Sequence, residues 1–154
     1  MEIMNYCESY FEDVFEVVHR TIEDIYPKYY PRSAVDFFHD HHSRENMKNK
    51  LPHEFTLVIT DNNRIFGTGS LFKNEICRFF ILPEYQSKGY GKMLLKELEM
   101  HIEKDKYDNF ALDASLGAVK FYQKNNYVYN DYKMIDLPGG NYLCYLEMIK
   151  KPSV

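Results

Sequence analysis

The sequence predicts a single α/β domain with a mixed β-sheet. Apolar residues recur at helical spacing in several segments, a run rich in β-branched and aromatic residues predicts a hairpin, and a strand–helix–strand unit predicts a parallel pair of strands. The chain has 154 residues, of which 45% are hydrophobic and 27% charged, so it can bury a core of its own. No linker, repeat or low-complexity run interrupts it. We therefore expect one domain spanning residues 1–154.

The first part of the chain predicts a short strand and two helices. Residues 3–6 favour the strand, and the spacing of Ser9 and Glu12 is that of a capping box, which satisfies the first free amides of a helix. Apolar positions then recur at helical spacing until a proline ends the pattern. A second helix is expected over residues 33–42, where Asp36 completes another capping box.

The rest of the chain predicts the sheet. The hairpin pairs residues 55–60 with residues 65–72 across an Asp-Asn-Asn turn. Residues 75–82 form the next strand, and a helix that begins near Gly91 leads into a short strand at residues 110–112, which makes a parallel βαβ unit. The last predicted elements are a helix at residues 115–125 and two antiparallel strands at residues 127–135 and 142–149.

Charge and composition exclude several classes of partner. A formal net charge of −4 and a pI of about 5.9 argue against nucleic acid, because phosphate contacts need clustered Lys and Arg. No apolar run approaches the length of about 20 residues that a bilayer span requires. The acidic start of the chain is unlike a signal peptide. We therefore expect a cytoplasmic protein without a nucleic-acid or membrane partner, either a monomer or a homodimer.

The cysteines do not suggest a disulfide framework or a zinc site. Cys7, Cys77 and Cys144 are odd in number and widely spaced, which is typical of reduced thiols. Cys77 and Cys144 fall in predicted strands, where we interpret them as small buried hydrophobes. A catalytic thiol is the alternative.

The run His39-Asp40-His41-His42 invites comparison with a metal site, because His39 and His42 are one helical turn apart. No third ligand is evident near them in the sequence. We interpret these histidines as solvated side chains and expect no metal; a place in a ligand pocket is the alternative.

The segment from Phe79 to Lys92 carries the strongest functional signal. It predicts a strand, a glycine-containing loop and then a helix, so that the first free amides of the helix and the positive end of its dipole point at one spot. Such a spot suits a phosphate or pyrophosphate, which Gly89 and Gly91 would allow to approach the backbone. The spacing of a P-loop is absent, and the dinucleotide fingerprint needs a small residue where Leu94 stands.

This loop resembles the acetyl-CoA signature of the GNAT superfamily, Gln/Arg-x-x-Gly-x-Gly/Ala. A second segment, residues 118–127, is similar to the family's Ala-x-x-Phe-Tyr-x-x-x-Gly-Phe/Tyr, with Asn126 in place of the glycine. The resemblance implies a mixed, mostly antiparallel twisted sheet with a central parallel βαβ unit and helices on both faces. It also implies an N-acetyltransferase that moves an acetyl group from acetyl-CoA to a primary amine of a small molecule or peptide. The residues that match the signature are Gln86-Ser87-Lys88-Gly89-Tyr90-Gly91.

The resemblance further implies acetyl-CoA as co-substrate and no metal or prosthetic group. The backbone amide of Phe79 would polarise the thioester oxygen, and Ile81 would pair with the pantetheine amides. Tyr122 would protonate or hydrogen-bond the departing sulfur, with packing at the core edge as the alternative. Ser115 stands where many members have Asn. The expected cofactor contacts are Phe79, Phe80, Ile81, Gln86, Ser87, Lys88, Gly89, Tyr90, Gly91, Lys92, Ser115 and Tyr122.

Glu75 is the candidate base for the incoming ammonium. It lies eleven residues before Gln86, the offset at which histone-type members of the family carry their catalytic glutamate. Strand alternation predicts that Glu75 shares a face with Phe79 and Ile81. A solvated carboxylate at the start of the strand is the alternative.

An aromatic wall is expected around the acceptor. In the family the first two helices and their connecting loop line that pocket, and such a wall can hold an ammonium or stack on a planar acceptor. Core packing is the alternative for the phenylalanines. A non-catalytic acyl-CoA sensor of the same fold is the alternative function, and transfer of a longer acyl chain is a third reading. The expected wall residues are Tyr26, Tyr29, Tyr30, Phe37 and Phe38.

Overall fold

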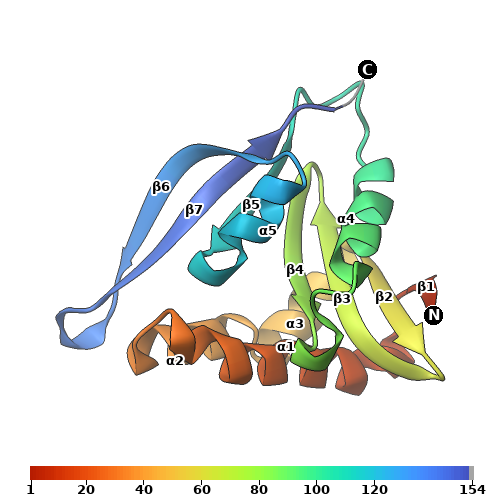
Figure 1. Ribbon diagram of the computed structural model, residues 1–154. Helices are drawn as coiled ribbons and strands as arrows, with labels where there is room; N and C mark the ends of the chain where they lie inside the picture. The colour runs from red at the N-terminus through yellow and green to blue at the C-terminus, as the bar shows by residue number, and fades with distance from the viewer. Residues whose placement is uncertain (153–154) are drawn as a thin grey trace.

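A computed structural model describes residues 1–152, in which seven strands form one sheet in the order β1-β2-β3-β4-β5-β7-β6 (Figure 1). β4 and β5 run parallel, and the other neighbouring pairs are antiparallel. The prediction of a mixed, mostly antiparallel sheet with a central parallel pair is confirmed. The strands are β1 (Glu2–Asn5), β2 (Phe55–Asp61), β3 (Arg64–Phe72), β4 (Glu75–Ile81), β5 (Phe110–Ser115), β6 (Val128–Asp136) and β7 (Tyr142–Lys150).

Within residues 1–152, five α-helices cover both faces of the sheet. α1 packs on β3 and β4 from one face, and α4 packs on β2 and β3 from the other. On this second face, Leu98 of α4 packs directly over Gly69 of β3: its Cδ1 lies 2.6 Å from the position that a Cβ on Gly69 would occupy. No helix in the described range is both long and apolar enough to cross a bilayer. The helices are α1 (Phe11–Ile25), α2 (Arg32–His41), α3 (Arg44–Lys50), α4 (Tyr90–Met100) and α5 (Val119–Lys124).

The starts of α1 and α2 differ from the predicted capping boxes. Ser9 lies inside a 3₁₀ turn, Glu8–Tyr10, and its hydroxyl is 3.0 Å from the sulfur of Cys7, so it cannot cap a helix that begins at Phe11. Asp36 accepts a hydrogen bond of 2.9 Å from Arg32 Nε instead of capping α2. The prediction of both capping boxes is therefore wrong. The side chain of Ser9 contacts Cys7 within a local turn, and the side chain of Asp36 forms an ion pair with Arg32, so neither is available to cap a helix.

The short helix α3 was not predicted. Ser43 caps it by accepting a hydrogen bond of 3.2 Å from the amide of Asn46. Met47 is the single fully buried residue of this helix, so the sequence offers no helical repeat of apolar positions. α3 matters because it carries the chain from α2 back to the sheet along one wall of the site.

The predicted hairpin and a bulge in β4 set the geometry of the sheet. Asn62 and Asn63 turn the chain with φ of 48° and 64°, values that asparagine tolerates. In β4, Arg78 and Phe79 together oppose the single residue Gly69 of β3, and Arg78 has φ of 45°. β4 then pairs with β5 only at its first two residues, so the two strands separate beyond them. This separation opens the centre of the sheet.

A buried ion pair ties the bulge to Glu54, the residue just before β2. Arg78 pairs with Glu54, and their side chains are 3% and 8% exposed. Arg78 Nη1 also lies 3.4 Å from the hydroxyl of Ser70, which in turn is 2.7 Å from that of Thr56. A buried pair of charges is costly unless both members are matched, so this contact fixes the backbone at the bulge rather than adding much stability.

Candidate active site

A continuous cavity of about 1410 Å³ runs between the separated strands β4 and β5. At one end it reaches the loop before α4, and at the other it reaches α2, α3 and the inner face of β7. Its lining joins the loop, the bulge, Tyr122 and Glu75, which are far apart in the sequence. Most of the predicted site residues therefore meet around one space.

The loop before α4 presents backbone amides to this cavity. Ser87 and Gly89 have φ of 60° and 89°, and Gly89 is the residue that caps α4. The side chain of Gln86 donates a hydrogen bond of 2.8 Å to the carbonyl of Ile81, which ties the loop to the end of β4. The free amides at the start of α4 are thus held in place, as a phosphate site requires.

Most of the residues predicted to contact the cofactor line the cavity, and two do not. Lys88 places its ammonium 5.6 Å from the ring centroid of Tyr85, and Tyr90 packs on Phe66 at 5.0 Å. Lys124, which was not predicted, lines the same end and adds positive charge there. The predicted contacts that line the cavity are Phe79, Phe80, Ile81, Gln86, Ser87, Gly89, Gly91, Lys92, Ser115 and Tyr122.

Tyr122 lies in the middle of the cavity, where β4 and β5 diverge. Its side chain is 5% exposed and packs near Phe79, with ring centroids 6.2 Å apart. Its hydroxyl has no hydrogen-bond partner among residues 1–152. Burial raises the pKa of Tyr122, so the hydroxyl keeps its proton at neutral pH.

Glu75 lines the cavity, on a different face of the sheet from the one predicted. Phe79 points to the face of Gly69, where a Cβ would lie 2.9 Å from its ring. Glu75 lies opposite Phe72 of β3, so the two side chains point to the same face. Phe72 is three residues after Gly69, so alternation along β3 places Phe72, and with it Glu75, on the face opposite to that of Phe79. The expectation that Glu75 shares a face with Phe79 and Ile81 is wrong, because the bulge adds one residue and reverses the alternation.

The charge environment of Glu75 is acidic. Glu75 is an exposed residue by surface area, but its partial loss of solvent in the cavity and then the nearby carboxylate of Asp113 raise its pKa above the ordinary value. Asp113 in turn pairs directly across the sheet with Glu147, and the ammonium of Lys133 lies 2.8 Å from Glu147. A raised pKa makes Glu75 a better proton acceptor at neutral pH than a free carboxylate.

The predicted aromatic wall divides into lining and structural residues. Tyr26 and Phe38 line the cavity with ring centroids 4.6 Å apart, and Phe37 joins them. Burial raises the pKa of Tyr26 to about 12. Tyr29 is exposed and covers Gly117, outside the lining. Tyr30 is also outside it: its hydroxyl donates to the carbonyl of Cys144 at 2.8 Å and accepts from the amide of Leu116 at 2.9 Å.

A sequence model described as an acetyltransferase (GNAT) domain matches residues 25–135, well over half of the chain. The protein belongs to the GNAT acetyltransferase family. A search of curated proteins found no match.

Solved GNAT structures share this fold over almost the whole chain. A GCN5-related N-acetyltransferase from Rhodopseudomonas palustris has a TM-score of 0.86 at 20% identity, covering 98% of this chain and 95% of its own. The PaiA N-acetyltransferase from Thermoplasma acidophilum, solved with coenzyme A, has a TM-score of 0.75 at 22% identity, covering 98% of each chain. A ribosomal-protein-alanine N-acetyltransferase from Brucella melitensis has a TM-score of 0.70 at 16% identity, covering 99% and 100%.

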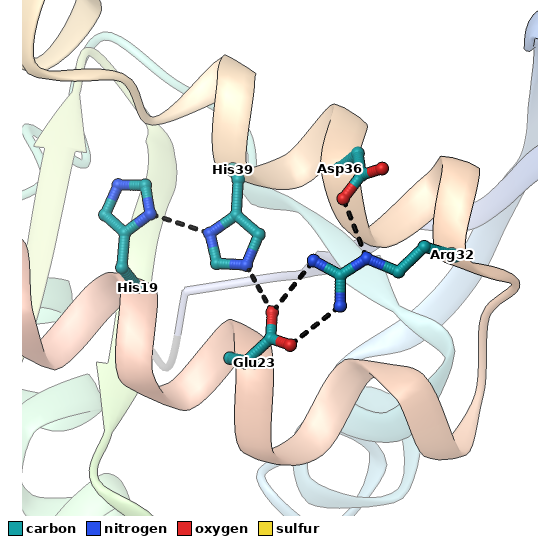
Figure 2. Close-up of polar contacts among 5 residues, drawn as sticks. All are labelled: His19, Glu23, Arg32, Asp36 and His39. Carbon is teal, nitrogen blue, oxygen red and sulfur yellow. Dashed lines mark hydrogen bonds and ion pairs between the residues drawn. The ribbon is translucent and has the colours of Figure 1, made fainter.

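In this GNAT chain His39 of α2 belongs to a network with His19 and Glu23 of α1 (Figure 2). The Nδ1 atoms of His19 and His39 are 2.7 Å apart, and His39 Nε2 lies 2.8 Å from Glu23. Arg32 and then His39 lower the pKa of Glu23 to about 2, so Glu23 is a carboxylate and accepts from both. His19 Nε2 donates to the carbonyl of His42 at 2.6 Å. Residues 1–152 contain no group of three or more His, Cys, Asp or Glu arranged for a metal.

Several residues in this GNAT cavity were missed by sequence reasoning. Arg78 and Asp113 each interrupt an otherwise apolar strand, and a charge in such a place is a usable signal of a buried polar site. Lys50 carried no such signal, whereas His42 belongs to the histidine run for which a place in a ligand pocket was the stated alternative. Cys77 lines the cavity, but burial raises its pKa to about 12, which keeps the thiol protonated and unreactive.

Proposed function

We propose that the protein is an acetyl-CoA-dependent N-acetyltransferase that moves an acetyl group to a primary amine by direct attack. The observation that carries the proposal is the single cavity that joins the loop before α4, the bulge of β4, Tyr122 and Glu75. These four features would supply a phosphate site, a donor to the thioester oxygen, a proton donor and a base, and all of them border one space.

The cofactor end fits a nucleotide thioester. Backbone amides from Ser87 to Gly91, with Lys92 and Lys124 nearby, would hold the pyrophosphate. The gap between β4 and β5 leaves strand backbone free to pair with the pantetheine amides. Acetyl-CoA supplies the activated acyl group and a thiolate that leaves readily.

Three residues would then carry the transfer. Glu75 accepts a proton from the ammonium, which generates the neutral amine that attacks the thioester carbon. The amide of Phe79, which has no register partner on β3, donates to the carbonyl oxygen as it becomes negative. Tyr122 gives its proton to the departing sulfur and is reprotonated by the second proton that the attacking nitrogen loses as it becomes the amide.

A thiol-release assay with acetyl-CoA tests the proposal across a panel of polyamines, aminoglycosides, amino acids and peptides. We expect thiol release above the background of acetyl-CoA hydrolysis with at least one class of amine. Binding of acetyl-CoA without turnover on any amine would contradict catalysis and favour the acyl-CoA sensor.

Replacing Glu75 by Gln is expected to lower kcat/KM by about 10-fold near neutral pH and by less at alkaline pH. The base acts only when ionised, so activity of the parent rises with pH through the raised pKa of Glu75. The amine, with a pKa of about 10, loses its own proton at alkaline pH and then needs no base. The measurement is kcat/KM against pH.

Glu16→Gln is the matched control, because it removes the same charge from an exposed position of α1, outside the lining of the cavity and not among the charges that act on Glu75. It should leave the pH profile close to that of the parent. If Glu75→Gln also keeps the parental profile, Glu75 is a surface carboxylate and the base lies elsewhere.

A further inference from the structure

The acceptor end of the cavity contains a buried histidine with one ring nitrogen free. His42 is 8% exposed, lines the cavity and stands edge-on to Phe80 with ring centroids 5.4 Å apart. Its Nδ1 is shielded and has no hydrogen-bond partner among residues 1–152. Its Nε2 is not among the shielded atoms and makes no hydrogen bond within the same residues, so this nitrogen is the one open to the cavity.

The chemistry of His42 makes it a hydrogen-bond donor to whatever enters. Burial and then the nearby charge of Arg78 lower its pKa well below the ordinary value, so the ring is neutral at pH 7 and carries one proton. A buried N–H without a partner is rarer in proteins than a buried acceptor without one. The proton therefore belongs on Nε2, where it faces the cavity.

Positive charge lies beside this donor. Lys50, the last residue of α3, lines the cavity and has no ion-pair partner among the described residues, whereas Arg78 is matched by Glu54. His42 lies just before α3 and Lys50 ends it, so both line the cavity from one short helical segment, and the charge of Lys50 contributes to the lowered pKa of His42. An N–H donor next to an unmatched cation favours an anion.

The opposite side of the same space is acidic. Glu75 and Asp113 line it from β4 and β5, and burial raises the pKa of each. Glu75 lies three residues before Arg78 on β4, about 10 Å along the strand. Arg78 pairs with Glu54, which directly follows the 3₁₀ turn Leu51–His53 after Lys50. The acidic residues and the end of α3 therefore border the same part of the cavity.

We propose that His42 and Lys50 form a subsite for a carboxylate on the acceptor, so that the acceptor is an amine with a carboxylate on the same molecule. This inference rests on the proposed function, because it assigns the acceptor class of that same site. The carboxylate accepts from His42 Nε2 and pairs with Lys50, while the amine turns toward Glu75 and the thioester. The His19–His39–Glu23 network holds the backbone of His42 in place (Figure 2).

The test compares acceptors that differ only in the carboxylate. Phenylalanine is set against 2-phenylethylamine, and lysine against 1,5-diaminopentane, with kcat/KM measured at saturating acetyl-CoA. We expect the carboxylated member of at least one pair to be favoured by about 10- to 100-fold, the value of a hydrogen bond to a charged group. The pair that shows the larger preference is then measured with the variants described next.

Lys50→Gln and His42→Phe should remove most of that preference by lowering kcat/KM for the carboxylated member alone. Phe at residue 42 keeps a ring against Phe80 and removes the donor. Lys48→Gln is the matched control, because Lys48 lies on the same helix but holds its ammonium 5.2 Å from the ring centroid of Phe11, outside the lining. This control should keep the parental preference.

Binding separates failure of this inference from failure of the proposed function. Titration of each amine into the CoA-bound protein needs no turnover, and the carboxylated member should bind more tightly to the parent and to Lys48→Gln than to Lys50→Gln. Equal binding and equal turnover of both members in every pair overturn the subsite. The same holds if Lys50→Gln weakens both members alike. Tighter binding of the carboxylated member without turnover supports the subsite and contradicts only catalysis.

Discussion

Replacing Gly91 by Asp is expected to abolish the stabilisation of the protein by acetyl-CoA. A Cβ at this position would lie 3.1 Å and 3.2 Å from two ring carbons of Phe121, so the new side chain presses on the wall of the cavity. Its carboxylate would also stand in the first turn of α4, where the pyrophosphate is proposed to bind. We expect affinity to fall by about 100-fold or more, the value of two charge-assisted hydrogen bonds.

The measurement is the melting temperature with and without acetyl-CoA. A ligand at about 100 times its Kd stabilises the folded state by about 2.7 kcal/mol, which raises the melting temperature of a domain of this size by roughly 5–10 °C. The shift should disappear in Gly91→Asp, while the protein without ligand stays folded because an acid in the first turn suits the helix dipole.

Met93→Asp is the matched control for this change. Met93 is 44% exposed on the same helix and lies outside the lining of the cavity, so the variant carries the same added charge without obstructing the site. It should keep the parental shift. Parental affinity in Gly91→Asp would place the phosphates of the cofactor away from the start of α4.

Replacing Tyr122 by Phe is expected to lower kcat and kcat/KM together, by about 10- to 10³-fold. The ring keeps its packing against Phe79 and Tyr127, and the hydroxyl that is removed has no partner among residues 1–152. Stability and cofactor affinity should therefore survive. The loss falls on the transition state because the hydroxyl acts on the sulfur only as the thiolate departs. A thiolate leaves fairly well unaided, which sets the lower end of the range.

Tyr127→Phe provides the contrast. The hydroxyl of Tyr127 donates to Glu99 at 2.9 Å in the core, so its removal should cost about 1–3 kcal/mol of stability and leave turnover per folded molecule unchanged. The two variants thus separate a catalytic hydroxyl from a structural one. A folded Tyr122→Phe protein with parental kcat would leave backbone polarisation at Phe79 and the proximity of the reactants as the sources of rate.

Local sequence was sufficient for the elements whose pattern is repeated or whose turn is specified by its own residues. The hairpin of β2 and β3 follows from β-branched runs around Asn62 and Asn63, and Asn126 adopts the left-handed conformation, φ of 70°, expected after the last helix. The loop before α4 follows from its glycines and its place between strand and helix. α3 was not predicted because only one of its residues, Met47, is buried, so its sequence shows no helical repeat of apolar residues.

The sequence by itself determined the fold class, the order of the strands along the chain and the conformation expected of the loop before α4, because propensity, spacing and turn chemistry act over a few neighbouring residues. Only the tertiary structure decided which side chains meet. The bulge at Arg78 and Phe79 depends on pairing with β3 and on the ion pair with Glu54, and it moved Glu75 to the acceptor face. The environment of His42 likewise depends on α3 and β4 closing around it, since burial and the charges of neighbours come from segments distant in sequence.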